Sequence, residues 1–161
     1  MSLLDTLPKS SKDGVIYDAE VVHGLLPQKD PFAFVDEINE LYEEDGKKAI
    51  KATKYILGTE GYFRGHFPTE PVMPGVLQIE TMAQAGNLLA ALCFEEEVKG
   101  KRPAFMGVNG VRFRRAVKPG DVLSIHATLE KFRRGIMVFK ADITCNGEPV
   151  SSAEEVTAMM V

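Results

Sequence analysis

One stretch of the chain, residues 76–94, constrains the fold more than any other. Nearly all of it is apolar. The polar interruptions are Gln78, Glu80, Thr81, Gln84 and Asn87. Pro74 and Gly75 stand just ahead of it and supply a helix start. The pattern predicts a helix, Val76 to Phe94, that is buried on most sides. A membrane span is disfavoured because Glu80 falls in the second turn and flanking anchors are lacking.

A change of hydrophobic period marks the second half of the chain, where a repeat of 3.6 residues gives way to a repeat of two. Residues 122–131 and 137–145 alternate apolar with polar side chains and indicate half-buried antiparallel strands. Asn146-Gly147 is a strong signal for a tight hairpin turn. Earlier strand candidates run from Phe32 to Leu41 and from Lys48 to Ile56. We therefore expect an α+β fold of the hot-dog kind, with a curved antiparallel sheet around one long helix.

The whole chain reads as a single domain. Its 161 residues, 45% of them apolar, suffice to fill one core, so we expect one domain over 1–161. Residues 1–16 lack a sustained period and are expected to form a loosely ordered lead-in before a short helix near residues 18–25. Cys93 and Cys145 lie in apolar surroundings without metal-site spacing, which indicates reduced thiols. Since neither an export leader nor an anchor is indicated, we expect a cytoplasmic protein.

Three prolines restrict the loop that precedes the apolar helix: Pro68, Pro71 and Pro74. A helix start leaves backbone N–H groups unpaired and carries a partial positive charge. The amide of Gly75 is therefore a candidate for polarising a carbonyl oxygen. The alternative is an ordinary helix start after a proline turn.

Glu80 is an unusual residue for a buried helix. A carboxylate between Ile79 and Met82 destabilises the fold unless it is protonated or well partnered. Gln84, four residues on, lies over the same face and can hydrogen-bond and orient the carboxyl group. Burial should raise the pKa of Glu80, which favours a role as general acid near neutral pH.

His66 is the one histidine of three in a setting suited to catalysis, because it lies in the loop before the helix that carries Glu80. His126 falls on the polar face of a predicted strand, and His23 lies in an early amphipathic stretch. Histidines in such settings are more often structural than catalytic. Elimination of water β to a thioester carbonyl needs a base, an acid and a dipole for the developing oxyanion. His66, Glu80 and the Gly75 amide match these three needs without a cofactor, and one His with one Glu falls short of a metal site.

The segment GHFPTEPVMPGVLQIETMAQAG, residues 65–86, resembles the signature of the FabZ-type 3-hydroxyacyl-acyl-carrier-protein dehydratases of type II fatty-acid synthesis. The resemblance continues upstream in LLPQKDPFAFVDEI and downstream in FMGVNGVRFRRAVKPGD and EKFRRGIMVFKADI. It implies that His66 and Glu80 are the catalytic pair and that Gly75 supplies the carbonyl-polarising amide. It also implies a homodimer in which the two side chains come from different subunits, and in many members a trimer of dimers. Phe105 or Met106 would lie near an apolar acyl tunnel, with core packing as the alternative role.

Some positions depart from the family pattern. Gln28 replaces the more frequent histidine, and Asn109-Gly110 stands where an acidic pair is common. These departures bear on substrate preference and loop geometry. Glu80 itself favours dehydration without isomerisation, because the related dehydratase-isomerases carry aspartate at the matching position.

Basic residues gather between residues 111 and 134, where seven stand against two acidic ones in a chain of net charge −4. The net charge gives no global reason to bind nucleic acid. We predict that Arg112, Arg114, Arg115 and Lys118 attract the acidic acyl carrier protein, against the alternative that they are merely solvated.

Two other functions stay open at this point. The first is a hot-dog thioesterase, in which a carboxylate activates water against the thioester carbonyl. The second is a non-catalytic acyl-binding module that has kept the fold and lost turnover. The complete segment from His66 to Glu80 favours the dehydratase over both.

Overall fold

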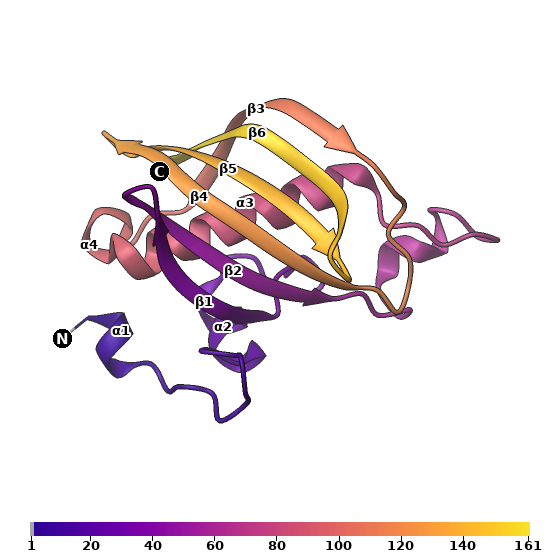
Figure 1. Cartoon of the computed structure of the whole chain (residues 1–161), viewed down its shortest axis with the longest axis horizontal. Coiled ribbons are helices and arrows are strands. Elements are labelled where there is room, and N and C mark those ends of the chain that lie inside the picture. The colour runs from indigo at the N-terminus through magenta and orange to yellow at the C-terminus, as the bar shows by residue number, and fades with distance from the viewer. Residues whose placement is uncertain (1) are drawn as a thin grey trace.

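The computed structural model describes residues 2–161 and shows one long helix, α3 (Gly75–Cys93), in the concave face of a six-stranded sheet (Figure 1). The strands are β1 (Glu37–Glu44), β2 (Lys47–Tyr55), β3 (Pro103–Phe113), β4 (Val122–Arg133), β5 (Ile136–Cys145) and β6 (Glu148–Met160). The shorter helices are α1 (Leu3–Thr6), α2 (Ala19–Leu25), the 3-10 turn η1 (Gly61–Arg64) and α4 (Glu95–Val98). The sheet is curved and open, and the predicted hot-dog architecture is confirmed.

The sheet order is β1-β2-β4-β5-β6-β3, and every neighbouring pair is antiparallel. Tight turns join three of the pairs at residues 45–46, 134–135 and 146–147. Both residues of each turn have positive φ, as a type I′ turn requires. The chain leaves α3 and α4 to form β3 at the edge beside β6, and then crosses the sheet to β4. One edge of the sheet is therefore β1 and the other is β3.

The predicted long helix and the strand at residues 48–56 match α3 and β2 closely. The strand predicted from Phe32 to Leu41 is wrong in its first half, because β1 begins only at Glu37. The cause is a side chain of α3. The Gln84 amide accepts a hydrogen bond from the backbone N–H of Phe34 at 2.8 Å and donates one to the carbonyl oxygen of Phe32 at 2.9 Å. These backbone groups are satisfied by a side chain and not by a neighbouring strand.

Residues 2–16, which we expected as a loosely ordered lead-in, contain the helical turn α1 and make specific contacts with the rest of the chain. Ser2 and Asp5 form a capping box at the start of α1. The Leu3 N–H donates to both carboxylate oxygens of Glu95, each at 3.2 Å. Lys9 Nζ donates to the Tyr17 hydroxyl at 2.8 Å. The short helix predicted near residues 18–25 is confirmed as α2.

The core lies between α3 and the inner face of the sheet. Met82 and Leu89 on α3 and Ile125 and Phe139 on the strands are fully buried. Both cysteines are free, as predicted, with Cys145 in the core and Cys93 half-buried. Within residues 2–161, no helix combines the length and the apolarity that a bilayer crossing demands.

Candidate active site

The loop between η1 and α3 holds His66 in one orientation. The Nδ1 atom of His66 lies 2.8 Å from the carbonyl oxygen of Val72. A carbonyl oxygen can only accept a hydrogen bond, so Nδ1 must carry the proton of this contact. In the neutral ring, Nε2 then keeps its lone pair and is the atom that can accept a proton from a ligand. This arrangement suits a general base.

The start of α3 shares a hollow with His66. The hollow is largely apolar and is lined by His66, Val72, Met73, Gly75, Val76, Gln78, Ile79, Phe113, Arg114, Arg115 and Ala116. Gly75 is the first residue of α3, so its N–H has no intrahelical acceptor. The structure therefore brings two of the predicted groups, the His66 ring and the Gly75 amide, to one hollow.

Phe113 is a residue of this hollow that the sequence analysis missed. A Cβ atom built on Gly75 would lie 2.8 Å from the Phe113 ring, closer than real Cβ contacts come. The ring is nevertheless about half exposed. A side chain at position 75 would therefore force the Phe113 ring to shift and would also cover the helix start. No periodicity in the sequence pairs these two residues, because β3 meets α3 only through the tertiary fold.

Glu80 lies on α3 five residues after Gly75, which turns it about 140° around the helix axis. It is partly buried, and it does not line the hollow beside His66. The Gln84 Nε2 donates to its Oε2 at 2.9 Å, so the predicted orienting contact is present. Burial raises the pKa of the Glu80 carboxyl, and the Gln84 hydrogen bond opposes this in part. A raised pKa favours a carboxyl that holds a proton to donate.

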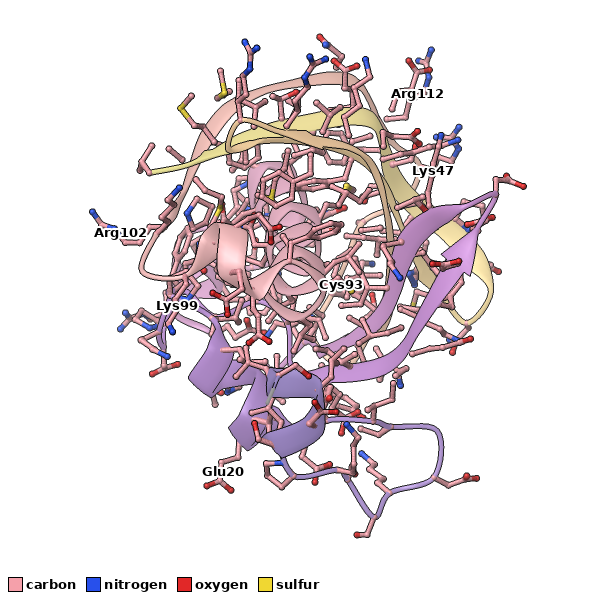
Figure 2. All side chains as sticks on the ribbon, turned by 90° about the vertical axis from the view of Figure 1, so that its left-hand side faces the viewer. Glu20, Lys47, Cys93, Lys99, Arg102 and Arg112 are labelled. Atoms are coloured by element: carbon pink, nitrogen blue, oxygen red, sulfur yellow. The ribbon has the colours of Figure 1, made fainter. Side chains whose placement is uncertain are left out.

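The predicted basic residues separate into two groups. Arg114 and Arg115 line the hollow, and Arg112 and Lys118 are exposed nearby in sequence. Arg112 points away from the body of the molecule (Figure 2). Arg115 is only half-exposed and lies 3.6 Å from Asp121.

The remaining basic residues, Lys131, Arg133 and Arg134, stand at the β4–β5 turn. Because β4 carries about 35 Å of extended chain, this second group lies at the far end of the sheet.

Four further positions remain from the sequence analysis. The two predicted tunnel residues lie on β3, and the two departures from the family pattern lie on β3 and before β1. Phe105 and Met106 are both about half exposed on the edge strand β3, so neither packs in the core of the single chain. Asn109 donates to Glu155 on β6 at 3.0 Å. Gln28 keeps its Oε1 enclosed, without a hydrogen-bond partner among residues 2–161.

The other two histidines occupy structural positions. His23 Nε2 lies 3.0 Å from Asp36, and His126 Nδ1 lies 3.7 Å from Asp142 across neighbouring strands. Over the described range of 2–161, His, Cys, Asp and Glu side chains form no group of three or more that could hold a metal ion.

Comparison with known proteins places these residues in a family. A family model described as a FabA-like domain matches residues 26–154. A 3-hydroxyacyl-[acyl-carrier-protein] dehydratase FabZ from Caldicellulosiruptor bescii is 43% identical over 139 residues, which cover 86% of this chain and 96% of that protein. A FabZ from Clostridium botulinum strain Loch Maree is 44% identical and covers 85% and 92%.

Solved structures share the fold at lower identity. The dehydratase heterocomplex ApeI:P from Xenorhabdus doucetiae matches with a TM-score of 0.67 at 19% identity, over 87% of this chain and 90% of the other. A thioesterase from Haemophilus influenzae matches with a TM-score of 0.60 at 20% identity, over 92% and 93%. The fold alone is therefore compatible with a dehydratase or a thioesterase. The two sequence relatives, in contrast, are both FabZ dehydratases. By its sequence, the chain belongs to the FabZ 3-hydroxyacyl-[acyl-carrier-protein] dehydratases of the FabA-like family.

Proposed function

We propose that the protein is a hydro-lyase that converts a (3R)-hydroxyacyl group on acyl carrier protein to the trans-2-enoyl group in type II fatty-acid synthesis. The observation that carries this proposal is the pairing of a histidine whose Nε2 is free with an unpaired helix-start amide in one apolar hollow. No cofactor enters the proposed reaction, since every proton moves between the substrate and side chains.

In the proposed mechanism, the Gly75 N–H binds the thioester carbonyl oxygen and stabilises the negative charge that develops there. His66 Nε2 removes the proton from Cα, and the electron pair left behind forms the Cα–Cβ double bond. The Cβ–O bond breaks, and protonated Glu80 gives its proton to the departing hydroxyl, so that water leaves. His66 ends protonated and Glu80 ionised, and a proton passes from one to the other or through water before the next cycle.

We infer a homodimer because His66 and Glu80 do not share a hollow within one chain. The edge strand β3 offers eleven residues of backbone for pairing with a second copy. Large apolar side chains, each roughly half exposed or more, surround this edge and the His66 hollow: Phe67, Val76, Phe105, Met106 and Phe113. Such a patch is typical of an interface. Pairing of two β3 strands would bring His66 of one chain toward Glu80 of the other, and three such dimers could form the hexamer found in many members.

The direct test is a dehydration assay of the purified protein with a short-chain (3R)-hydroxyacyl thioester. Absorbance of the conjugated enoyl thioester should rise while the thioester bond stays intact. Release of free acid and thiol would indicate the thioesterase. Tight acyl binding without turnover at any chain length would indicate the binding module. We place this activity in the cytoplasm, and we expect Glu80 to give dehydration without double-bond isomerisation.

The carrier protein is proposed to dock beside the His66 hollow. Arg114→Glu should raise the KM for carrier-bound substrate by about three- to tenfold at low salt, because an acidic partner loses an attractive charge. The KM for a small pantetheine thioester should change by less, because that substrate lacks the acidic partner. Arg133→Glu, at the far end of β4, is the matched control and should leave both constants unaltered. Equal effects of the two variants would remove Arg114 from docking.

Burial raises the pKa of Glu80, and the Gln84–Glu80 hydrogen bond lowers it in part, so this bond affects the pH range in which Glu80 can act as an acid. Gln84→Met removes a donor that stabilises the ionised carboxylate, so the pKa of Glu80 should rise further. Because activity requires protonated Glu80, the alkaline limb of the pH profile of kcat/KM should move to higher pH. An unmoved limb in a folded variant would show that Gln84 only holds the 32–34 segment.

A further inference from the structure

A second pocket lies at the opposite end of α3 from His66. It has a volume of about 410 Å³. Its enclosed walls are apolar and include Leu26, Leu88 and Val98. Charged residues of and after α4 form its outer rim: Glu95, Glu96, Lys99 and Lys101. Figure 2 looks onto this end of the molecule, where α4 lies in front of the end of α3 and Lys99 points outward.

This pocket lies on the same helix face as Glu80. Residues 80, 84, 87 and 91 follow one another at helical spacings of four, three and four, so they form one stripe along α3. Asn87 and Ala91, the last two members, line the pocket. At 1.5 Å per residue, Asn87 lies about 10 Å and Ala91 about 16 Å beyond Glu80 along the helix axis. A linear chain that starts at Glu80 and follows α3 arrives at this pocket.

The inner end of the pocket carries one buried polar side chain. Asn87 is 8% exposed, and its Oδ1 has no hydrogen-bond partner among residues 2–161. Gln84, the stripe member before it, is fully buried under the 32–34 segment. A chain that followed this stripe from Glu80 would have to displace or pass beside Gln84 before it met Asn87 and the apolar walls of the pocket.

The N-terminal turn closes part of the pocket. Leu3 of α1 lines it and packs against the core, whereas Leu4 is 36% exposed and is not part of the wall. The two hydrogen bonds from the Leu3 N–H to the Glu95 carboxylate attach α1 to α4. Residues 1–25 lie outside the part of the chain that the FabA-like model matches.

We propose that the pocket receives the distal end of the acyl chain and that Leu3 forms its outer wall, so that the N-terminal turn limits the length of acyl chain the enzyme accepts. This inference rests on the proposed dehydratase function. Leu3 is then a specificity-determining residue that never meets the reacting atoms. Short acyl chains end before Asn87 and do not contact Leu3, whereas long acyl chains reach Leu3 and press against it.

The test compares kcat/KM for short-chain and long-chain (3R)-hydroxyacyl thioesters in the wild type, Leu3→Ala and Leu4→Ala. Leu3→Ala should raise the long-to-short ratio by about tenfold or more, since a few methylene groups in an apolar pocket have effects of this size. Leu4→Ala should leave the ratio unchanged. Retained short-chain turnover in both variants shows that the reaction centre and the fold are intact. A ratio in Leu3→Ala equal to that of the wild type would overturn the proposal.

A binding readout separates this inference from the proposed function. The chain contains no tryptophan, so Leu3→Trp introduces a single tryptophan at the wall and Leu4→Trp introduces one beside it, each excited selectively over the tyrosines. Long-chain acyl thioester should change the emission of Leu3→Trp, while short-chain thioester should not, and Leu4→Trp should respond to neither. If the wild type lacks dehydration on every chain length and this emission change still appears, the function is wrong and the pocket assignment stands. A silent Leu3→Trp in an enzyme with normal short-chain turnover contradicts the pocket assignment alone.

Discussion

Replacing His66 with Ala, or Glu80 with Gln, is expected to lower kcat for dehydration by about two or more orders of magnitude. His66→Ala removes the atom that takes the Cα proton. Glu80→Gln keeps the shape of the side chain and its contact with Gln84 but cannot supply a proton to the leaving hydroxyl. The measurement is enoyl absorbance under saturating substrate, with circular dichroism to confirm the fold. His126→Ala is the control, because that ring lies beside Asp142 on the sheet and should leave kcat within about twofold of the wild type.

The same two variants test whether the site is shared between subunits. The test uses a heterodimer of one His66→Ala chain and one Glu80→Gln chain, isolated through two different tags; if sites are shared, it contains one site with both side chains intact and one with both replaced. If His66 and Glu80 act across the interface, this heterodimer should recover about half of the wild-type activity per dimer. If both residues of a site came from one chain, each site would lack a residue and the heterodimer would stay inactive. The two geometries therefore predict opposite results from inactive parents.

Much of the fold could be predicted from the sequence because the responsible forces are local. The apolar run became α3, and the two alternating segments became β4 and β5. In each of them the burial pattern can be seen in consecutive residues of the sequence. The Asn146-Gly147 turn is equally local, since both of its residues adopt positive φ. The break before β1 was not predictable in this way. It depends on Gln84, which is fifty residues away in the chain from the Phe34 N–H that it binds.

The same distinction between local and tertiary determinants applies to the candidate site. The orientation of Glu80 by Gln84 was predictable, because residues four apart on a helix are neighbours whatever the tertiary fold. The tautomer of His66 was not, because it depends on a carbonyl oxygen of a loop that only the folded chain brings to Nδ1. Nor was the contact of Phe113 with Gly75, which joins an edge strand to a helix start. The pairing of His66 with Glu80 across a dimer stays a prediction from family resemblance, and the single chain supports it only by keeping Glu80 out of the His66 hollow.

Gly86 lies at the centre of α3, and its replacement by Ala sets two effects against each other. Alanine is the better helix former by up to about 1 kcal/mol. However, a Cβ atom at this position would lie 2.4 Å from two ring carbons of Phe139, which is fully buried on β5. Overpacking of a core costs about 1–3 kcal/mol, and a contact this close to a rigid ring belongs at the upper end. We expect Gly86→Ala to lower the free energy of unfolding by about 2 kcal/mol.

Gly24→Ala is the matched control, because Gly24 also lies in a helix and a Cβ atom there would meet nothing within 4 Å. With packing removed from the comparison, only helix propensity remains, so Gly24→Ala should raise stability by up to about 1 kcal/mol. Urea unfolding at one fixed protein concentration measures both, since a dimer's stability depends on concentration. Phe139→Leu should reduce the cost of Gly86→Ala, because the ring atoms in the clash are then absent. Gly86→Ala could instead stabilise the protein as Gly24→Ala does. That result would mean that α3 can move away from β5. The close packing of α3 on the sheet would then not fix the position of Glu80.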